Sequence, residues 1–118
     1  ADIAGAIELC ERGGCDNVIT GAPAHRSPYF NLVERDKAGF VKIVKPLATS
    51  LARRQDAPEC FDCNASIYVW PREKLFVLRD VVVERTAIYV MPEERSRDID
   101  SVFDFELVEF LMGRRAAG

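Results

Sequence analysis

The chain has 118 residues, 48% of them hydrophobic, and a formal net charge of −3. This composition predicts one globular domain or part of one, without the clustered basic surface of a nucleic-acid-binding protein. No apolar run approaches the roughly 20 residues that cross a membrane, and the first residues lack a signal-peptide pattern. We therefore expect a soluble cytoplasmic protein with no nucleic-acid or membrane partner.

The first predicted elements are a helix and a strand. Residues 2–13 repeat apolar side chains at helical spacing, with Asp2 as the expected cap and Gly13 as the expected end. Residues 17–21 form a short apolar run between turn residues, which is long enough only for a strand. This order indicates an α/β fold, and because a complete α/β domain needs more parallel strands than this, we interpret the chain as part of a larger domain.

A β-hairpin is predicted next. Residues 30–34 and 40–44 are the expected strands, and Gly39 supplies the flexible position of the turn between them. Because a two-stranded ribbon is only marginally stable alone, we expect residues 27–45 to pack on another subunit. His25 precedes the hairpin without an evident nucleophile or orienting carboxylate, so we interpret it as a loop residue that makes hydrogen bonds.

Residues 53–70 carry the most concentrated chemical signals. Arg53 and Arg54 open the stretch, Asn64 lies in its middle, and a β-branched and aromatic run at its end indicates a strand. Binding groups often lie in polar loops that rigid strands hold in place. The arginines belong to the densest positive segment, residues 42–54, which could receive a carboxylate or phosphate or could be a solvated face.

Four cysteines raise the possibility of a metal or redox site. Cys60 and Cys63 form a C-x-x-C pair of the kind that zinc sites use. Cys10 and Cys15 have a wider spacing, and Cys10 falls on the expected core face of the first helix. We therefore favour buried reduced thiols over structural zinc or a redox pair, because free cysteine packs as a small apolar residue.

The last third of the chain is predicted to contain a short helical turn, a strand and a long helix. Residues 71–75 begin with proline and suit a helical turn, and residues 87–91 form a strand stopped by Pro92. Ser101 is the expected cap of the final helix and Gly113 its expected end, after which the chain should fray. One face of this helix carries Phe103, Leu107, Phe110 and Leu111.

Asp98 and Asp100 form a second chemical constellation. In extended backbone, side chains two residues apart point to the same side at about 6.5–7 Å. Both carboxylates could therefore converge on Mg²⁺, which takes one or two carboxylates and completes its coordination with water and substrate phosphate. The alternative is a solvated acidic loop before a helix N-terminus, where negative charge is favourable.

The chain resembles the carboxy-terminal half of the acylneuraminate cytidylyltransferases, the CMP-sialic acid synthetases, in the ordered passages SPYFNLVE, RRQDAP, NASIYVW and VMPEERSRDIDSVFDFELVEFLM. The resemblance covers nearly the entire chain. It implies transfer of CMP from CTP to the anomeric hydroxyl of a nonulosonic acid, with release of pyrophosphate. It also implies a Rossmann-like three-layer α/β/α domain that forms a homodimer through a projecting β element, which the predicted hairpin fits. It does not choose among nonulosonic acids.

The resemblance assigns roles to individual residues. Asp98 and Asp100 match the metal-binding aspartates, which hold Mg²⁺ against the nucleotide phosphates. Such a metal would neutralise charge on the triphosphate, and an arginine could meet the sugar carboxylate through two parallel hydrogen bonds. Positions on the sugar side are matched by Arg54, Asn64 and Tyr68, with Gln55 adjacent.

Two departures from the family pattern affect the expected activity. The family usually has Asn-Gly where this chain has Asn64 and Ala65, which could alter the approach of the backbone to the sugar. The glycine-rich, basic nucleotide-binding loop of the family's amino-terminal half has no match here. We therefore expect residues 1–118 to be a single partial domain that supplies the sugar- and metal-binding half and is inactive alone.

Two other classes of function remain open from the sequence. The chain could be a non-catalytic oligomerisation or regulatory module derived from the same enzyme. It could also be a small interaction domain that binds zinc through its four cysteines.

Overall fold

The computed structural model describes residues 1–48 and 53–118, apart from the side chain of Arg54. The chain divides into two compact units, one formed by Ala1–Ala22 with Cys63–Gly118 and the other by Pro23–Asp62. The described residues form both helices and strands, two of which pair in parallel, so the structure agrees with the predicted α/β class.

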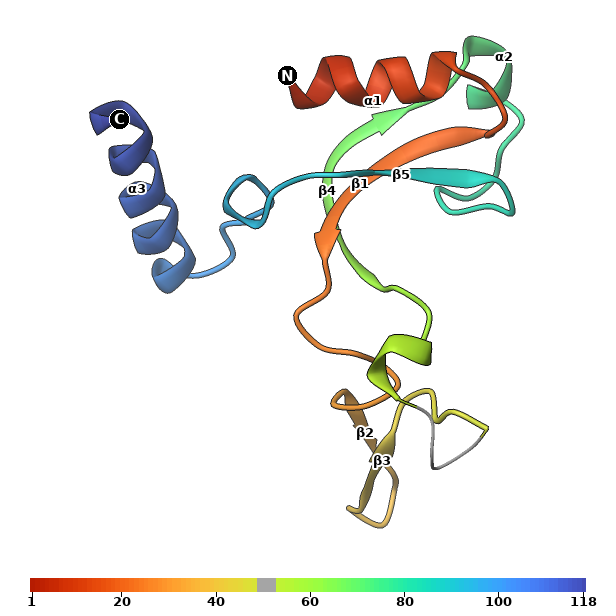
Figure 1. The fold of residues 1–118 in the computed structure, drawn as a ribbon, viewed down its shortest axis with the longest axis vertical. Helices are drawn as coiled ribbons and strands as arrows, with labels where there is room; N and C mark the ends of the chain where they lie inside the picture. The colour runs from red at the N-terminus through yellow and green to blue at the C-terminus, as the bar shows by residue number, and fades with distance from the viewer. Residues whose placement is uncertain (49–52) are drawn as a thin grey trace. The chain divides into compact units, whose positions relative to one another are not determined.

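The first unit is built on a three-stranded sheet with the order β4-β1-β5. β1 (Asn17–Pro23) lies between β4 (Phe61–Val69) and β5 (Thr86–Val90) (Figure 1). β1 and β5 are parallel, with Ile19 opposite Ile88. β4 runs in the opposite direction to β1, as the arrows in Figure 1 show, so the sheet is mixed. The predicted strands in the regions of β1 and β5 are confirmed.

Helix α1 (Asp2–Glu11) packs against the sheet through one apolar face. Ala6 and Cys10 are buried with Val18 of β1 and form the core of the first unit. Burial raises the pKa of the Cys10 thiol, so this side chain stays protonated and packs as an apolar group, as predicted. The partly buried residues around this core are Leu9, Cys15, Ile67, Val69, Ala87 and Tyr89.

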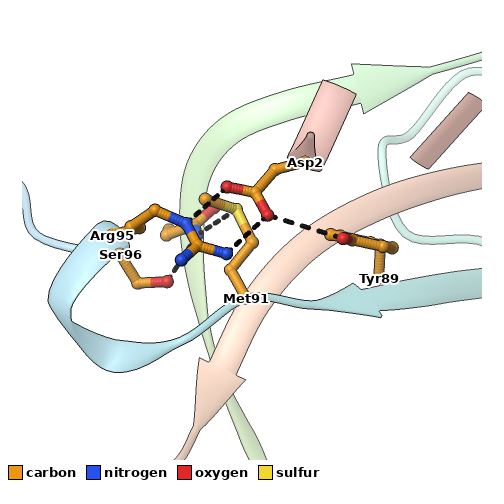
Figure 2. Close-up of polar contacts among 6 residues, drawn as sticks. Asp2, Tyr89, Met91, Arg95 and Ser96 are labelled. Atoms are coloured by element: carbon orange, nitrogen blue, oxygen red, sulfur yellow. Dashed lines mark hydrogen bonds and ion pairs between the residues drawn. The ribbon is translucent and has the colours of Figure 1, made fainter. Parts of the chain in front are cut away.

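The carboxylate of Asp2 joins α1 to the segment after β5 (Figure 2). Arg95 donates from Nε to Oδ2 at 2.8 Å and from Nη2 to Oδ1 at 2.9 Å, and the Tyr89 hydroxyl donates to Oδ1 at 3.4 Å. The hydrogen bond from Arg95 lowers the pKa of Asp2. The prediction that Asp2 caps α1 is wrong, because Ala1 occupies the cap position and the Asp2 carboxylate binds Arg95 instead.

A glycine allows Tyr89 to reach this carboxylate. A Cβ atom on Gly5 would lie 2.5 Å from ring atom Cε2 of Tyr89, so no larger residue fits beside the ring where it stands. Gly5 is therefore required for close packing between α1 and β5, although glycine is a poor helix former.

β4 contains a bulge at Asn64 and Ala65. Ala65 has a φ of 51°, in the left-handed region that alanine rarely adopts. The inward-facing residues are Asn64, Ile67 and Val69, with a spacing of three and then two, whereas a regular strand repeats every two residues. One extra residue in left-handed backbone explains this shift. The strand therefore begins earlier than predicted, and Asn64 lies within it and not in a polar loop.

Two short helical turns flank β5 along the chain. α2 (Arg72–Leu75) follows Pro71, as predicted from the fixed backbone of proline. η2 (Glu93–Arg95) follows Pro92, which stops the strand.

Helix α3 (Val102–Ala117) closes the chain. Ser101 caps it, because Oγ accepts a hydrogen bond from the backbone N–H of Asp104 at 3.1 Å, as predicted. The prediction that the helix ends at Gly113 is wrong, since a single interior glycine costs only about 1 kcal/mol and good helix formers surround it. Of the predicted apolar face, Leu107 and Leu111 are half-buried, whereas Phe103 and Phe110 are exposed.

The second unit contains the predicted hairpin with shorter strands. β2 (Val33–Arg35) and β3 (Val41–Ile43) pair in antiparallel register, with Glu34 opposite Lys42. These two side chains form an ion pair at 3.4 Å. None of the described helices combines the length and the apolar composition that a membrane-spanning segment requires.

The hairpin turn is organised by one aspartate. Oδ1 of Asp36 accepts from the backbone N–H groups of Ala38 and Phe40, each at 2.9 Å. Gly39 has a φ of 95°, so the turn uses glycine where an L side chain would be strained.

We predict that Ala65→Gly stabilises the chain. Relief of the left-handed strain should exceed the added entropy of the unfolded state, giving a gain of about 0.5–1 kcal/mol in the free energy of unfolding. Urea unfolding measures this difference. Ala4→Gly, at an exposed position of α1, is the control and should lower stability by about 1 kcal/mol. A destabilised Ala65→Gly variant would contradict the proposed strain.

We also predict that the contribution of Asp2 to stability depends on pH. The lowered pKa of Asp2 means that its stabilising effect is complete above its unfolded pKa of about 4 and is lost as the pH falls through the folded-state value. The difference in unfolding free energy between the native chain and Asp2→Asn should therefore shrink with acid. Arg95→Met should show the same trend because it removes the same pair, and a difference that is independent of pH would contradict the assignment.

Candidate functional site

Asn64 is only 4% exposed, and both ends of its amide are hydrogen-bonded. Oδ1 accepts from Oγ1 of Thr20 at 2.7 Å and from the backbone N–H of Ser66 at 3.1 Å. Nδ2 donates to Oγ of Ser96 at 3.0 Å and lies 3.3 Å from Sδ of Met91. Since a buried amide without partners is costly, this side chain fixes β1, β4 and the segment after β5 to one another.

The hydroxyl of Thr20 holds the other side of the bulge. It accepts a hydrogen bond from the backbone N–H of Ile67 at 3.1 Å and donates to Asn64. A single side chain of β1, that of Thr20, therefore forms hydrogen bonds with the residues on both sides of the bulge. The hydrogen bonds of Asn64 in the described residues act on protein groups, and a direct contact between Asn64 and a sugar stays a prediction.

Tyr68 is 41% exposed and lies on the face of β4 that is turned away from the core. Ile67 and Val69 pack on the core, so the alternation of the strand places Tyr68 on the opposite face. Its ring stacks on Trp70 with 5.7 Å between the ring centroids. A partly exposed tyrosine, with an apolar ring and a polar hydroxyl, suits an amphipathic ligand such as a sugar.

Asp98 and Asp100 are both exposed, in a segment without regular secondary structure between η2 and α3. No hydrogen bond or ion pair of either carboxylate is found within the part of the chain that the structure describes. The segment is fixed downstream, where Oδ2 of Asp104 accepts from the backbone N–H of Asp100 at 3.1 Å and from Oγ of Ser101 at 2.7 Å. The hydrogen bond from Ser101 lowers the pKa of Asp104, so this anchor is ionised at neutral pH.

Two exposed carboxylates without competing partners are suitable ligands for a hard cation. Across residues 1–48 and 53–118, no three side chains of His, Cys, Asp or Glu come together as a metal site. A cation held by Asp98 and Asp100 would therefore need water or a ligand for its remaining positions, which is the usual situation for Mg²⁺.

The cysteines do not form a zinc site among the described side chains. Cys10 is buried and Cys60 is half-buried, but Cys63 is exposed. The prediction of buried thiols is therefore right for Cys10 and wrong for Cys63, because Cys63 precedes the bulge on the outward face of β4.

The second unit holds the remaining residues predicted for the sugar side. Gln55 lies in η1 (Arg54–Asp56) and lines a pocket of about 340 Å³ together with His25 and Arg26. The side chain of Arg54 lies outside the described residues. The neighbouring Arg53 is 76% exposed and pairs with Asp56 at 3.8 Å.

Four residues that organise the first unit were not predicted to make the contacts they make: Thr20, Asp2, Arg95 and Ser96. Their contacts span separations of 44 residues for Thr20 with Asn64, 93 for Arg95 with Asp2 and 32 for Asn64 with Ser96. No local sequence pattern indicates contacts between residues that are so far apart in the sequence. One signal was present, since Thr20 is a polar residue in an apolar strand and a buried polar residue requires a partner.

Two curated proteins are similar to this chain over most of its length. No family model matches it. The chain is 41% identical over 112 residues to post-translational flagellin modification protein B of Campylobacter coli, an overlap of 95% of this chain and 46% of that protein. It is 45% identical over 95 residues to CMP-N,N'-diacetyllegionaminic acid synthase of Campylobacter jejuni, an overlap of 80% of this chain and 39% of that protein.

The chain therefore spans less than half the length of the curated relatives it matches. Both matches extend over most of this chain. The resemblance seen in the sequence is confirmed, and the chain has a family relationship to the CMP-nonulosonic acid synthetases.

Proposed function

We propose that this chain supplies the sugar- and metal-binding half of a cytidylyltransferase, which transfers CMP from CTP to a nonulosonic acid and releases pyrophosphate. The observation that carries the proposal is the 45% identity to CMP-N,N'-diacetyllegionaminic acid synthase over 95 residues. The name of that relative makes N,N'-diacetyllegionaminic acid the first substrate to test. Because the matched relatives are more than twice as long as the matched region, we expect the chain alone to be inactive.

Asp98 and Asp100 are the proposed ligands of Mg²⁺ and the catalytic residues of this chain. Their exposed carboxylates are hard oxygen donors, and a pair of them leaves room for water and phosphate around the ion. When bound, Mg²⁺ supplies positive charge that stabilises the triphosphate during transfer. The contribution of the chain is to hold both carboxylates on a segment anchored at each end.

The sugar side is assigned to Arg54, Gln55, Asn64 and Tyr68. Arg54 would receive the sugar carboxylate through two parallel hydrogen bonds, a geometry that lysine does not reproduce. Tyr68 is partly exposed, and Gln55 lines a pocket of the second unit. The buried amide of Asn64 would support the position of Tyr68 by fixing the bulge that precedes it.

The proposal also includes the assembly of the protein. The first unit would belong to a Rossmann-like three-layer domain, and the hairpin of β2 and β3 would form a homodimer interface. Support comes from apolar side chains that the hairpin leaves exposed, a feature that often marks protein–protein contacts. These residues are Leu32, Val33, Phe40 and Val41.

The first test is the effect of Asp100→Asn on a full-length protein that contains this chain. Loss of one metal ligand should reduce pyrophosphate release from CTP and N,N'-diacetyllegionaminic acid by about 100-fold, equivalent to roughly 3 kcal/mol of transition-state stabilisation. Glu109→Gln, an exposed carboxylate on α3, is the matched control and should leave the rate unchanged. Unchanged turnover in Asp100→Asn would refute the metal assignment.

The second test separates the sugar from the nucleotide. Arg54→Ala should raise the KM for the nonulosonic acid by roughly 30-fold, the effect of losing a charged pair worth about 2 kcal/mol, while the KM for CTP changes little. Arg53→Ala is the matched control, because the Arg53 side chain is exposed and pairs only loosely with Asp56. An equal rise in the KM values for both substrates would instead assign Arg54 to the nucleotide-binding side.

A further inference from the structure

We infer that Arg95 and Ser96 are positioning residues, which fix the backbone from which Asp98 and Asp100 project. Arg95 is held by Asp2 of α1, and Ser96 is held by Asn64 of β4. The inference deepens the proposed function and rests on it, because it assumes that the two aspartates bind a divalent cation.

The geometry of the segment makes such anchors necessary. Residues 97–100 have no regular secondary structure, so no ladder of backbone hydrogen bonds sets the position of the carboxylates. Ser96 is two residues before Asp98, and an extended chain spans at most about 3.6 Å per residue, so the two α-carbons lie within about 7 Å. The position of Ser96 therefore limits the positions that Asp98 can occupy.

The first anchor is the two-point pair between Arg95 and Asp2 (Figure 2). The two parallel hydrogen bonds fix the direction of the guanidinium as well as its distance, which a lysine would not do. The Asp2 side chain is 14% exposed and that of Arg95 is 35% exposed, so the pair is partly shielded from solvent. Asp2 is itself fixed, because it lies in the first turn of α1 and accepts a hydrogen bond from Tyr89.

The second anchor is the hydrogen bond from Asn64 to Ser96 at 3.0 Å. The amide of Asn64 is set from the sheet by Thr20, so its Nδ2 atom has a defined direction. Consecutive residues of the chain are thus tied to two different elements, α1 through Arg95 and β4 through Ser96. One anchor would let the segment pivot, whereas two anchors on neighbouring residues restrict both its position and its rotation.

The direction of the electrostatic effect separates positioning from charge. Arg95 is a cation three residues before Asp98, so its removal should by itself strengthen the binding of a divalent cation. Loss of positioning should weaken that binding. A weaker site in an Arg95 variant therefore has the sign that only positioning predicts.

The experiment uses Mn²⁺ as a paramagnetic probe of the full-length protein labelled with ¹⁵N. Broadening of the amide signals of residues 98–101 reports the apparent affinity of the site. We expect Arg95→Met to bind Mn²⁺ about 10-fold more weakly, the lower end of the effect seen when residues that orient metal ligands are lost. Ser96→Ala carries no change of charge and should weaken binding in the same direction.

Arg85→Met is the matched control. Arg85 also donates to a distant group, the carbonyl of Gly14 at 2.6 Å, but it lies at the other end of β5 and far along the chain from the aspartates. It should leave Mn²⁺ affinity within twofold of the native value. Thermal unfolding of each variant verifies that the protein is folded at the temperature of the titration.

The outcomes separate this inference from the proposed function. Unchanged or tighter Mn²⁺ binding in folded Arg95→Met and Ser96→Ala overturns positioning and leaves the metal site intact. If Arg95→Met does not fold, Ser96→Ala decides the question alone. Broadening in the native protein that does not involve residues 98–101 would refute the metal site and the positioning role together.

Discussion

The buried amide of Asn64 is the constraint on which the rest of the first unit depends. It bonds Thr20 on β1, its own strand through Ser66, and Ser96 after β5. An unpaired buried amide costs about 1–3 kcal/mol per lost partner, so displacing any of these elements is penalised at once. The small hydrophobic core on the α1 side buries apolar side chains of the sheet. The amide of Asn64 determines how the strands of the sheet are aligned.

The same amide explains the unusual backbone beside it. For Asn64 to face inward while Ile67 and Val69 also face inward, β4 must contain one extra residue, and Ala65 supplies it with a φ of 51°. Glycine would adopt this conformation without strain. The backbone strain at Ala65 is thus a local free-energy cost that the surrounding hydrogen bonds offset.

Local patterns predicted much of the fold, because its elements have local causes. Apolar runs between turn residues located β1 and β5, and proline and glycine located α2 and the hairpin turn. The errors have physical reasons too. Gly113 does not stop α3 because its neighbours favour helix, and Asp2 does not cap α1 because Arg95, 93 residues away, provides a stronger partner for its carboxylate.

Some features of the candidate site also have local causes in the sequence, whereas others depend on residues far away along the chain. D-x-D in a charged segment predicted either a carboxylate pair that binds a cation or a solvated acidic loop, and the structure places both Asp98 and Asp100 at the surface. The groups that hold this segment were not predictable, since they come from α1 and β4 and meet it only after folding. In the proposed function these carboxylates share a cation with water and phosphate, so they must be accessible, and accessible side chains lack the packing that would fix them. Anchors on the flanking residues would resolve this conflict, because they would restrain the backbone and leave the carboxylates accessible.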